Sequence, residues 1–390
     1  MTTPYDVAII GAGPVGMALA LMLAQNAPYP ERIVLFGRGG ALVPGDARDP
    51  RTLALNQGSR LTLAALGAFP AHATPIRTIH VSQSGRLGRT LIEHSDFDVD
   101  ALGHVTHYAS LIDALEARLH DSGISRRDAL KPGEISQQNA AATSTHPVSL
   151  HSSESAQARL VVMADGAGGA DITRQYNQHA VLATARASRP RAAWAWERFR
   201  SEGPLAVLPH PAGPDLYAIV WCCRPDTAAR LQSLSQAEFS RALTEAFGDR
   251  LGSLFAEGER HVFPLALKAR HRVVDRRIVS IGNAAQSLHP VAGQGLNLGL
   301  RDASQLCQAL APWLADAERS MRLDQALQRY AGNRQVDRTV TGLVTDIMPR
   351  VFATGLAPVE HLCGAALLAL DVSRTLRAPL ARHLLYGSRS

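Results

Sequence analysis

The chain has 390 residues, of which 46% are hydrophobic and 19% are charged, and its formal net charge at pH 7 is +6. This length exceeds one typical hydrophobic core and predicts two closely packed domains. The composition excludes disordered and fibrous proteins. Nearly all the positive charge is arginine, scattered along the chain with short pairs such as Arg126–Arg127. We therefore predict no nucleic-acid partner, while a weak attraction to anionic membrane surfaces stays compatible with the charge.

Cysteine usage and the chain ends indicate a cytoplasmic protein. The cysteines are Cys222, Cys223, Cys307 and Cys363, and they show no CxxC or Cys/His metal spacing. This pattern is typical of a reducing compartment and predicts no metal site. The N-terminus has no basic region and runs straight into a predicted strand, unlike a signal peptide. The apolar stretch 362–370 is too short to span a bilayer.

The first half of the chain begins with a predicted βαβ unit, which implies a parallel sheet. The strands predicted there are 5–10, 32–36 and 159–164. The helices predicted there are 14–25, 58–66 and 110–120. The polar stretch 131–158 is predicted to form irregular edge strands or a surface loop.

The pattern changes between about residues 180 and 264, where short strands replace the alternation of strand and helix. Strands are predicted at 204–209 and 216–223, with one helix at 236–247. This indicates a separate sheet inserted into the first domain. A buried strand is predicted again at 277–281, and the remainder of the chain is predicted to be helical.

Gly11, Gly13 and Gly16 form a GxGxxG pattern between the first strand and the first helix. In such a motif the first glycine permits a tight turn, the second lets a pyrophosphate approach the backbone, and the third lets helix and strand pack closely. The helix start offers N–H groups to the phosphates. The correct context on both sides favours dinucleotide binding over a glycine-rich turn without function.

One feature of this motif departs from the usual pattern. An acid is expected at the end of the second strand to hold a ribose hydroxyl, but Gly37 stands there. Ribose recognition is therefore expected from water, backbone or Arg38.

Two later motifs combine small and polar residues at strand ends. Asp165–Gly166 closes the strand at 159–164, and by itself this pair is equally compatible with a plain turn. The run from Ile278 to Asp302 continues from a strand through a polar loop containing His289 and Pro290 into a helix opened by Gly293 and Gly295. Glycines at a helix start place N–H groups beside a ligand.

Together these motifs resemble the para-hydroxybenzoate-hydroxylase-like flavoprotein monooxygenases, and among them the ubiquinone-biosynthesis hydroxylases of the 2-polyprenyl-6-methoxyphenol hydroxylase branch. The resemblance covers almost the whole chain, with further markers at 49–55, 203–206 and 263–265. It implies an α/β fold: a Rossmann-like FAD-binding domain, an inserted and mainly antiparallel β-sheet substrate domain, and a helical C-terminus. The implied FAD-binding domain is discontinuous and spans 1–75, 105–180 and 270–345. The implied substrate-binding sheet spans 76–104 and 181–269, and the C-terminal segment spans 346–390.

The resemblance also implies a set of cofactor contacts along the chain. The glycine motif would surround the FAD pyrophosphate, Gly282–Asn283 would meet the ribityl and pyrophosphate region, and Gly293–Asn297 would flank the isoalloxazine. Many relatives carry Asp where Asn283 stands and His where Gln286 stands. The expected cofactor-binding residues are Gly11, Gly13, Pro14, Gly16, Arg38, Arg51, Asp165, Gly166, Gly282, Asn283, Pro290, Gly293, Gln294, Gly295, Leu296 and Asn297.

The implied activity is hydroxylation of a polyprenyl phenol with dioxygen in ubiquinone biosynthesis, with FAD as cofactor and NADH or NADPH as the electron donor. His289 is the candidate base for the phenol hydroxyl, and a loop histidine that bonds backbone is an equal alternative. Two other functions stay open: a flavin dehydrogenase or reductase on the same fold, and a non-catalytic flavoprotein subunit of a biosynthetic complex.

The C-terminal segment from Pro349 to Tyr386 combines apolar residues with basic ones. These residues are Leu362, Ala365, Leu367, Leu368, Leu370, Arg374, Arg377 and Arg382. Such a combination predicts reversible binding to the inner face of a membrane. Packing of the same leucines against the nucleotide domain, and substrate delivery within a ubiquinone-biosynthesis complex, remain alternatives.

Overall fold

The computed structural model describes residues 5–37, 51–130, 132–137, 147–151, 155–166, 169–288, 293–316, 322–352, 354 and 356–387. Three residues expected at the cofactor or the substrate, Arg38, His289 and Pro290, lie outside these ranges. The roles expected of them stay predictions.

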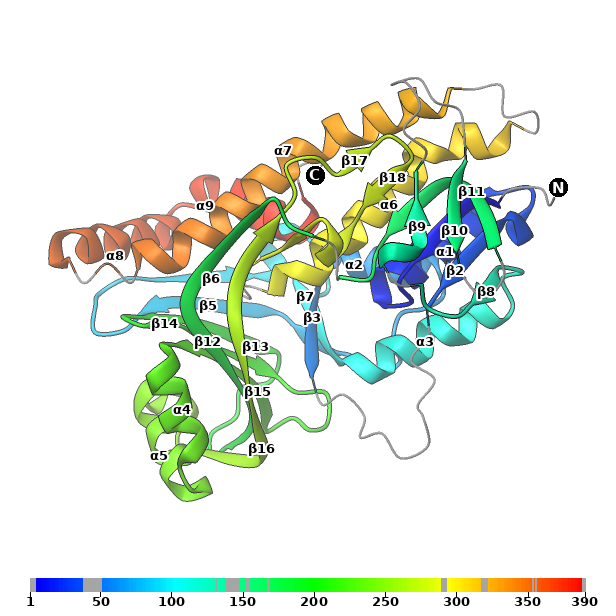
Figure 1. Ribbon diagram of the computed structural model, residues 1–390. Helices are drawn as coiled ribbons and strands as arrows, with labels where there is room; N and C mark the ends of the chain where they lie inside the picture. Colours follow the sequence, from blue (N-terminus) through cyan, green and yellow to red (C-terminus); the bar gives the residue numbers. More distant parts are fainter. Residues whose placement is uncertain are drawn as a thin grey trace.

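The first sheet contains the predicted βαβ unit and has the strand order β17-β18-β11-β1-β2-β8. Its parallel centre consists of β18 (Ile278–Ser280), β11 (Ser155–Met163), β1 (Tyr5–Ile10), β2 (Ile33–Phe36) and β8 (Ser125–Arg127). Antiparallel strands complete it: β17 (Val274–Asp275), β10 (Val148–His151) and β9 (Ile135–Ser136). The sheet lies to the right in Figure 1. Its central strands are nearly continuous apolar runs because both faces are covered.

Helices cover the first sheet and form the main core with it. They are α1 (Pro14–Asn26), α2 (Gln57–Ala65), α3 (Tyr108–His120) and α6 (Gln294–Ala315). Helix α1 is buried throughout from Gly16 to Leu23, because it lies between the sheet, α3 and α6. A small sheet beside these helices has the order β3-β7-β4, with bounds Thr52–Asn56, Gly103–His107 and Thr74–Ile76.

The second sheet is larger and has the order β19-β16-β12-β15-β14-β13-β5-β6. In that order the strands are Gln286–Ser287, Leu254–Ala269, Ile172–Ala187, Leu216–Cys223, Gly203–Pro209, Trp194–Arg200, Thr78–Gln83 and Arg89–Glu93. Its pairs are antiparallel except for β5 with β13. Helices α4 (Pro225–Ser233) and α5 (Gln236–Phe247) cover one face and share a core with it. Helix α5 starts with a capping box between Ser235 and Glu238.

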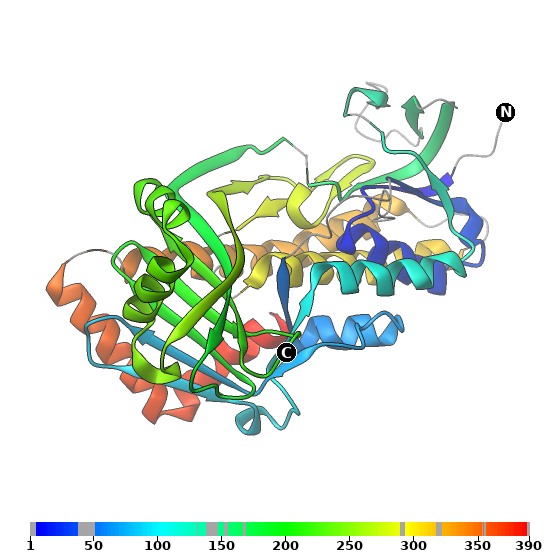
Figure 2. The same ribbon diagram turned by 90° about the horizontal axis from the view of Figure 1, so that it is seen from below.

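Three helices complete the chain: α7 (Leu323–Val351), α8 (Ala357–Val372) and α9 (Arg374–Tyr386). Helix α7 runs along α6, and α8 lies against the edge strand β6, as both views show (Figures 1 and 2). Leu91 N donates to Asp371 Oδ1 at 2.7 Å, which ties β6 to α8. Asn56 Nδ2 donates to Leu384 O at 2.8 Å, which ties the start of α2 to α9. The C-terminal helices therefore join the second sheet to the helices that cover the first sheet.

Short 3-10 turns connect several of these elements. They are η1 (Pro30–Arg32), η2 (His94–Phe97), η3 (Pro132–Glu134), η4 (Asp249–Leu251) and η5 (Gly282–Ala284).

The expected fold class is confirmed: a Rossmann-like part, a mainly antiparallel second sheet and a helical C-terminus are all present. The domain boundaries stay a prediction, and β12 runs through the boundary expected at 180. Among the helices that the structure describes, none is long and apolar enough to cross a bilayer. The described residues also contain no group of three His, Cys, Asp or Glu side chains placed to hold a metal ion.

Candidate functional site

The glycine motif forms the turn between β1 and α1. Gly11 has φ +114°, and a Cβ there would lie 2.5 Å from Asp165 N. A Cβ on Gly16 would lie 1.9 Å from Gly11 O, so Gly11 and Gly16 are required by close backbone packing. A Cβ on Gly13 would meet nothing within 4 Å. Gly13 is therefore the motif glycine whose surroundings leave room for a ligand.

Helix α1 begins directly at this open glycine. Gly13 is the N-cap and Pro14 is the first helical residue, and no described side chain caps the helix. A helix start of this kind attracts phosphate, because its backbone N–H groups and its dipole both favour an anion. The turn thus fits a pyrophosphate.

Gly37 explains the missing acid at the end of β2. It has φ +144°, and a Cβ there would lie 2.7 Å from Ala12 N. A side chain at this position would collide with the glycine motif, so this turn excludes the acid rather than merely lacking it.

The loop after β18 meets the glycine motif through Val15. Gly282 has φ +57°, and a Cβ there would lie 3.4 Å from Val15 Cγ1. A Cβ on Gly299 of α6 would lie 2.7 Å from Val15 Cγ2 and 3.2 Å from Gly282 Cα. The first and the last sequence motifs therefore form one continuous surface.

Asp165 and Gly166 lie at the carboxyl end of β11, beside the same loop. A Cβ on Gly166 would lie 3.5 Å from Asn283 Cβ, and Asp165, Gly166 and Asn283 are all exposed. The expected contacts of these three residues therefore lie on one open edge of the first sheet, where α/β folds bind ligands.

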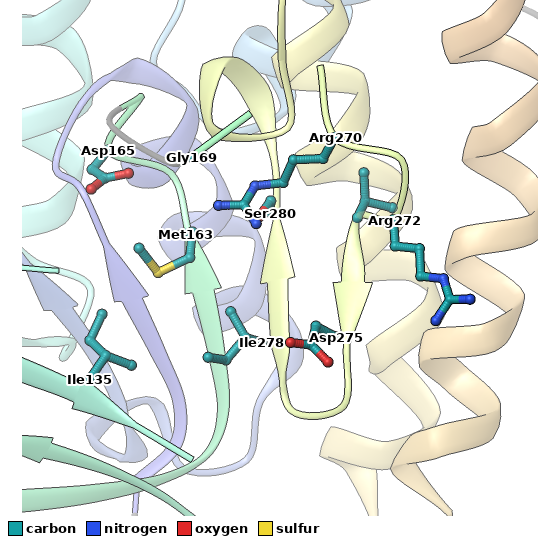
Figure 3. Close-up of a pocket in the computed structure, with 10 residues that line it drawn as sticks. Ile135, Met163, Asp165, Gly169, Arg270, Arg272, Asp275, Ile278 and Ser280 are labelled. Atoms are coloured by element: carbon teal, nitrogen blue, oxygen red, sulfur yellow. The ribbon is translucent and has the colours of Figure 1, made fainter. Parts of the chain in front are cut away.

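A cavity of about 250 Å³ opens next to Asp165. Figure 3 shows Met163 at the end of β11 and Asp165 on the loop that follows it at one wall, Ile278 and Ser280 on β18 at its floor, and Arg270 directed across it. Arg270 Nε donates to Ala284 O at 3.1 Å, which holds this side chain beside the η5 turn.

Helix α6 begins against β3. Gly293 has φ +60°, and a Cβ there would lie 3.1 Å from Ala54 Cβ. Asn297 fixes this contact, since its side chain accepts from Asn56 N at 2.9 Å and donates to Ala54 O at 2.9 Å and to Gly293 O at 2.7 Å. The Asn297 side chain is thus occupied in positioning the helix start.

The remaining residues of this helix start differ in their surroundings. Gln294 is buried, and Leu296 packs against the main core. A Cβ on Gly295 would meet nothing within 4 Å, and no described side chain caps the helix. The open backbone near Gly295 can stabilise a nearby negative charge by up to ~2 kcal/mol.

Arg51 directly precedes β3 and is exposed. Its Cζ is 4.9 Å from the ring centroid of Tyr108, and its carbonyl oxygen accepts from Tyr108 N at 2.9 Å. This stacking holds the guanidinium near the strand that contacts α6.

A buried ion network lies beneath these loops. Asp302 Oδ2 accepts from Gly282 N at 2.9 Å, and its Oδ1 accepts from Arg334 Nε at 2.7 Å. Arg334 also donates to Asp337, which accepts from Arg301 at 3.0 Å. The side chains of Arg334 and Asp337 are 0% exposed. Burial alone would raise the pKa of Asp337, but Arg301 and Arg334 outweigh it and hold the pKa below its usual value.

Arg338 supports the same loop from its other end. Its Nε donates to Gln286 Oε1 at 3.0 Å, and its Nη2 donates to Arg270 O at 3.0 Å. Gln286 is buried, and its side chain accepts the hydrogen bond from Arg338.

The sequence motifs did not identify the supporting residues Asp302, Arg334, Asp337 and Arg338. A signal for the first was present, because Arg301–Asp302 closes the last motif. The other three lie on α7, where a charged residue in a helix is normally solvent-exposed.

The described residues fit an extended cofactor that carries a pyrophosphate. Gly13 leaves space at one helix start, Gly295 leaves space at a second, and Gly282–Asn283 lies between them. Comparison with known proteins identifies this cofactor. A family model described as FAD binding domain matches residues 45–336. The chain belongs to this FAD-binding family.

The relatives and a solved structure agree with this family. The chain is 29% identical to ubiquinone hydroxylase UbiL of Rhodospirillum rubrum, over 97% of this chain and 89% of that protein. It is 26% identical to 3-demethoxyubiquinol 3-hydroxylase of Escherichia coli, over 98% of each chain. The structure of p-nitrophenol 4-monooxygenase PnpA from Pseudomonas putida DLL-E4 superimposes with a TM-score of 0.75 at 16% identity, covering 100% of both chains. The resemblance to FAD-dependent monooxygenases of ubiquinone biosynthesis is confirmed, while the individual site residues stay predictions.

Gly13→Val should give a folded protein without flavin. The backbone at Gly13 (φ −80°, ψ 177°) suits valine and its Cβ would meet no protein atom, so only the approach of the pyrophosphate is blocked. Flavin content per chain and the thermal midpoint measure the two effects. Gly332→Val, on the exposed side of α7 and equally free of neighbours, is the matched control. Full flavin content in Gly13→Val would contradict the pyrophosphate site.

Arg334→Met should lower the free energy of unfolding by about 3–5 kcal/mol, because it leaves two buried carboxylates without their shared partner. Urea denaturation measures the loss. Arg350→Met is the control: it removes an ion pair with Asp346 on the same helix, but the Arg350 side chain is 37% exposed, and such pairs contribute about 0–1 kcal/mol. Equal losses in the two variants would show that the buried network does not support the fold.

Proposed function

We propose that this FAD-dependent monooxygenase hydroxylates the aromatic ring of a polyprenyl phenol in ubiquinone biosynthesis. The observation that carries the proposal is the meeting of Gly13, Gly282–Asn283 and α6 on one surface at the edge of the first sheet. The relatives named as ubiquinone hydroxylases extend over almost the whole chain, which supports the same substrate class here.

The protein supplies binding, orientation and electrostatics to this reaction. When bound, FAD accepts electrons and activates dioxygen so that one oxygen atom reaches the ring. The start of α1 at Gly13 holds the phosphates, and the start of α6 near Gly295 stabilises negative charge. Asn297 holds the start of α6 against β3, and Asp302 holds the Gly282 turn that meets the glycine motif, before any ligand arrives. Such preorganised dipoles cost no rearrangement during the reaction.

NADH or NADPH is the proposed electron donor. The cavity beside Asp165 supports this role, since it opens at the edge of the first sheet and Arg270 and Arg272 line it. The Arg270 guanidinium, which is directed across the cavity in Figure 3, suits a phosphate of a nicotinamide dinucleotide.

Labelled oxygen tests the proposed reaction directly. The purified protein, reduced in the presence of a short-chain 2-prenylphenol, should incorporate one atom of ¹⁸O from ¹⁸O₂ into the ring, as measured by mass spectrometry. Gly13→Val should incorporate none. Reoxidation of the bound flavin without any label in the phenol would instead favour a dehydrogenase or a non-catalytic flavoprotein.

The C-terminal helices support a proposal for where the substrate is collected. Leu367 of α8 packs with Phe199 and Phe352, as expected for leucines that stabilise the fold. Leu362 and Val372 of the same helix are 70% and 81% exposed. The outward positions of α8 carry no charged side chain between Pro358 and Val372; they are Pro358, His361, Leu362, Ala365, Ala366, Leu368, Ala369 and Val372.

We assign this outward face of α8 to a membrane surface. Leu87, at the β5–β6 turn, is 94% exposed and lies beside α8, because Leu87 O approaches Gly364. Arg374 borders the face and is 61% exposed, with its Nε 3.9 Å from Asp96 Oδ1, while Arg377 is held inward by Asp96 at 2.7 Å. Exposed leucines beside arginine give reversible binding to anionic lipid.

Leu362→Glu and Val372→Glu should each weaken co-sedimentation with vesicles containing anionic phospholipid by about tenfold, since a buried leucine or valine contributes about 1.5–3 kcal/mol. Val336→Glu is the matched control, because Val336 is 60% exposed on α7. Substitution is preferred to truncation before Pro349, which would remove α8 and α9 and with them the contacts to β6 and α2. Unchanged vesicle binding in both α8 variants would favour delivery of the substrate by a protein complex.

A further inference from the structure

Two histidines from different sheets contact each other where the small sheet meets the second sheet. His107 is the last residue of β7, and His210 follows the end of β14. Their ring centroids are 5.0 Å apart, and the planes cross at 79°. The His210 residue is 8% exposed, and His107 is half-buried.

The strand register places His107 on the side of the small sheet that faces the start of α6. His107 pairs with Thr52, and Val105 pairs with Ala54. Directly paired residues share a face, and so do residues two apart on one strand. His107 therefore shares its face with Ala54, whose Cβ lies 3.1 Å from the position of a Cβ on Gly293.

The second sheet forms the opposite wall. Val105 packs in one apolar cluster with Ala195 and with the partly buried Leu208. His210 comes two residues after Leu208, so it continues this wall toward His107. The histidines are thus a polar pair at the edge of an apolar seam that borders the start of α6.

Hydrogen bonding determines what each ring can offer to a ligand. Ala212 N donates to His210 Nδ1 at 3.2 Å, so in the neutral ring the proton is on Nε2. Burial and the neighbouring His107 lower the pKa of His210 to about 4, and burial lowers the pKa of His107. Both rings are therefore neutral at pH 7. His210 offers an N–H donor, and a neutral His107 offers one bare ring nitrogen.

We infer that His107 and His210 together bind the hydroxyl group of the phenol substrate, with His210 Nε2–H donating to its oxygen and His107 accepting its hydrogen. A hydroxyl group both donates and accepts a hydrogen bond, which matches this pair. A carboxylate has no proton to donate to the bare nitrogen of His107, so it would match only His210. By accepting the hydroxyl hydrogen, His107 would increase the electron density of the ring at the position that receives oxygen. This assignment rests on the proposed function.

Two probes isolate the hydroxyl group in the test. Binding of 2-methoxyphenol and of 1,2-dimethoxybenzene, which carries a methyl group in place of the hydroxyl hydrogen, is measured by equilibrium dialysis against the flavin-loaded protein. The wild type should prefer 2-methoxyphenol by about tenfold or more, the value of one or two hydrogen bonds. His107→Phe and His210→Phe should each bring the two affinities to within about twofold.

His104→Gln is the matched control because His104 is on the same strand but directs its ring at Phe69, with a centroid distance of 5.3 Å. It should keep the wild-type preference. Flavin content and the thermal midpoint are recorded for every variant, and His210→Gln replaces His210→Phe if the latter does not fold.

The inference is overturned if the wild type shows no preference, or if folded, flavin-loaded His107 and His210 variants keep it. The proposed function fails separately, through the absence of ¹⁸O in the product. A preference that depends on both histidines, in a protein that incorporates no label, would leave the hydroxyl site standing and remove the monooxygenase assignment.

Discussion

The buried ion pair of Arg334 with Asp302 is the interaction on which the rest of the site depends. Asp302 ends the last sequence motif and accepts from the backbone of Gly282, while Arg334 comes from α7 and also binds Asp337. One buried cation thus joins two helices to the turn that meets the glycine motif. Burying these charges is costly, and only complete pairing offsets the cost. The network therefore positions the cofactor loops more than it adds to stability.

The proposed site also includes a seam between the first sheet and the second sheet. The first sheet and α6 provide the helix starts that suit a pyrophosphate and a reduced cofactor, and the second sheet provides an apolar wall. The small sheet lies between them: β3 contacts α6 through Ala54, and β7 contacts the second sheet through Val105. In the proposed site the reacting ring lies where both sheets contribute, and α8 presents apolar residues at the outer edge of the second sheet.

Much of the fold could be predicted because local patterns agree with the tertiary structure. The strand 5–10, the helix 236–247 and the strand 216–223 match β1, α5 and β15 residue for residue. The long strands β12 and β16 were not predicted, because much of each is exposed and polar and their stability comes from pairing with each other over 16 residues each. The strands β5 and β6 form a local hairpin that was also not predicted strand by strand; β5 pairs in addition with β13, more than 100 residues away, and β6 is tied to α8.

The residues of the site also differ in whether the sequence alone reveals them. Gly11, Gly13 and Gly16 could be recognised by their fixed spacing: close backbone packing demands glycine at 11 and 16, and Gly13 leaves room for a ligand. Gly37 was noticed as a missing acid, but only the contact with Ala12 explains it. Arg334 carries no local signal, since a buried arginine in a helix is recognisable only from its partners. His107 and His210 are 103 positions apart in the sequence, and only the meeting of β7 and β14 brings them together.

The central claim is that this chain hydroxylates a ubiquinone precursor by means of bound FAD. Mass spectrometry of the quinone intermediates in a strain lacking the protein tests it most directly. The account predicts accumulation of a precursor that lacks one ring oxygen, its disappearance when the wild-type chain is restored, and its persistence with Gly13→Val. Normal ubiquinone content with no such precursor would contradict the account.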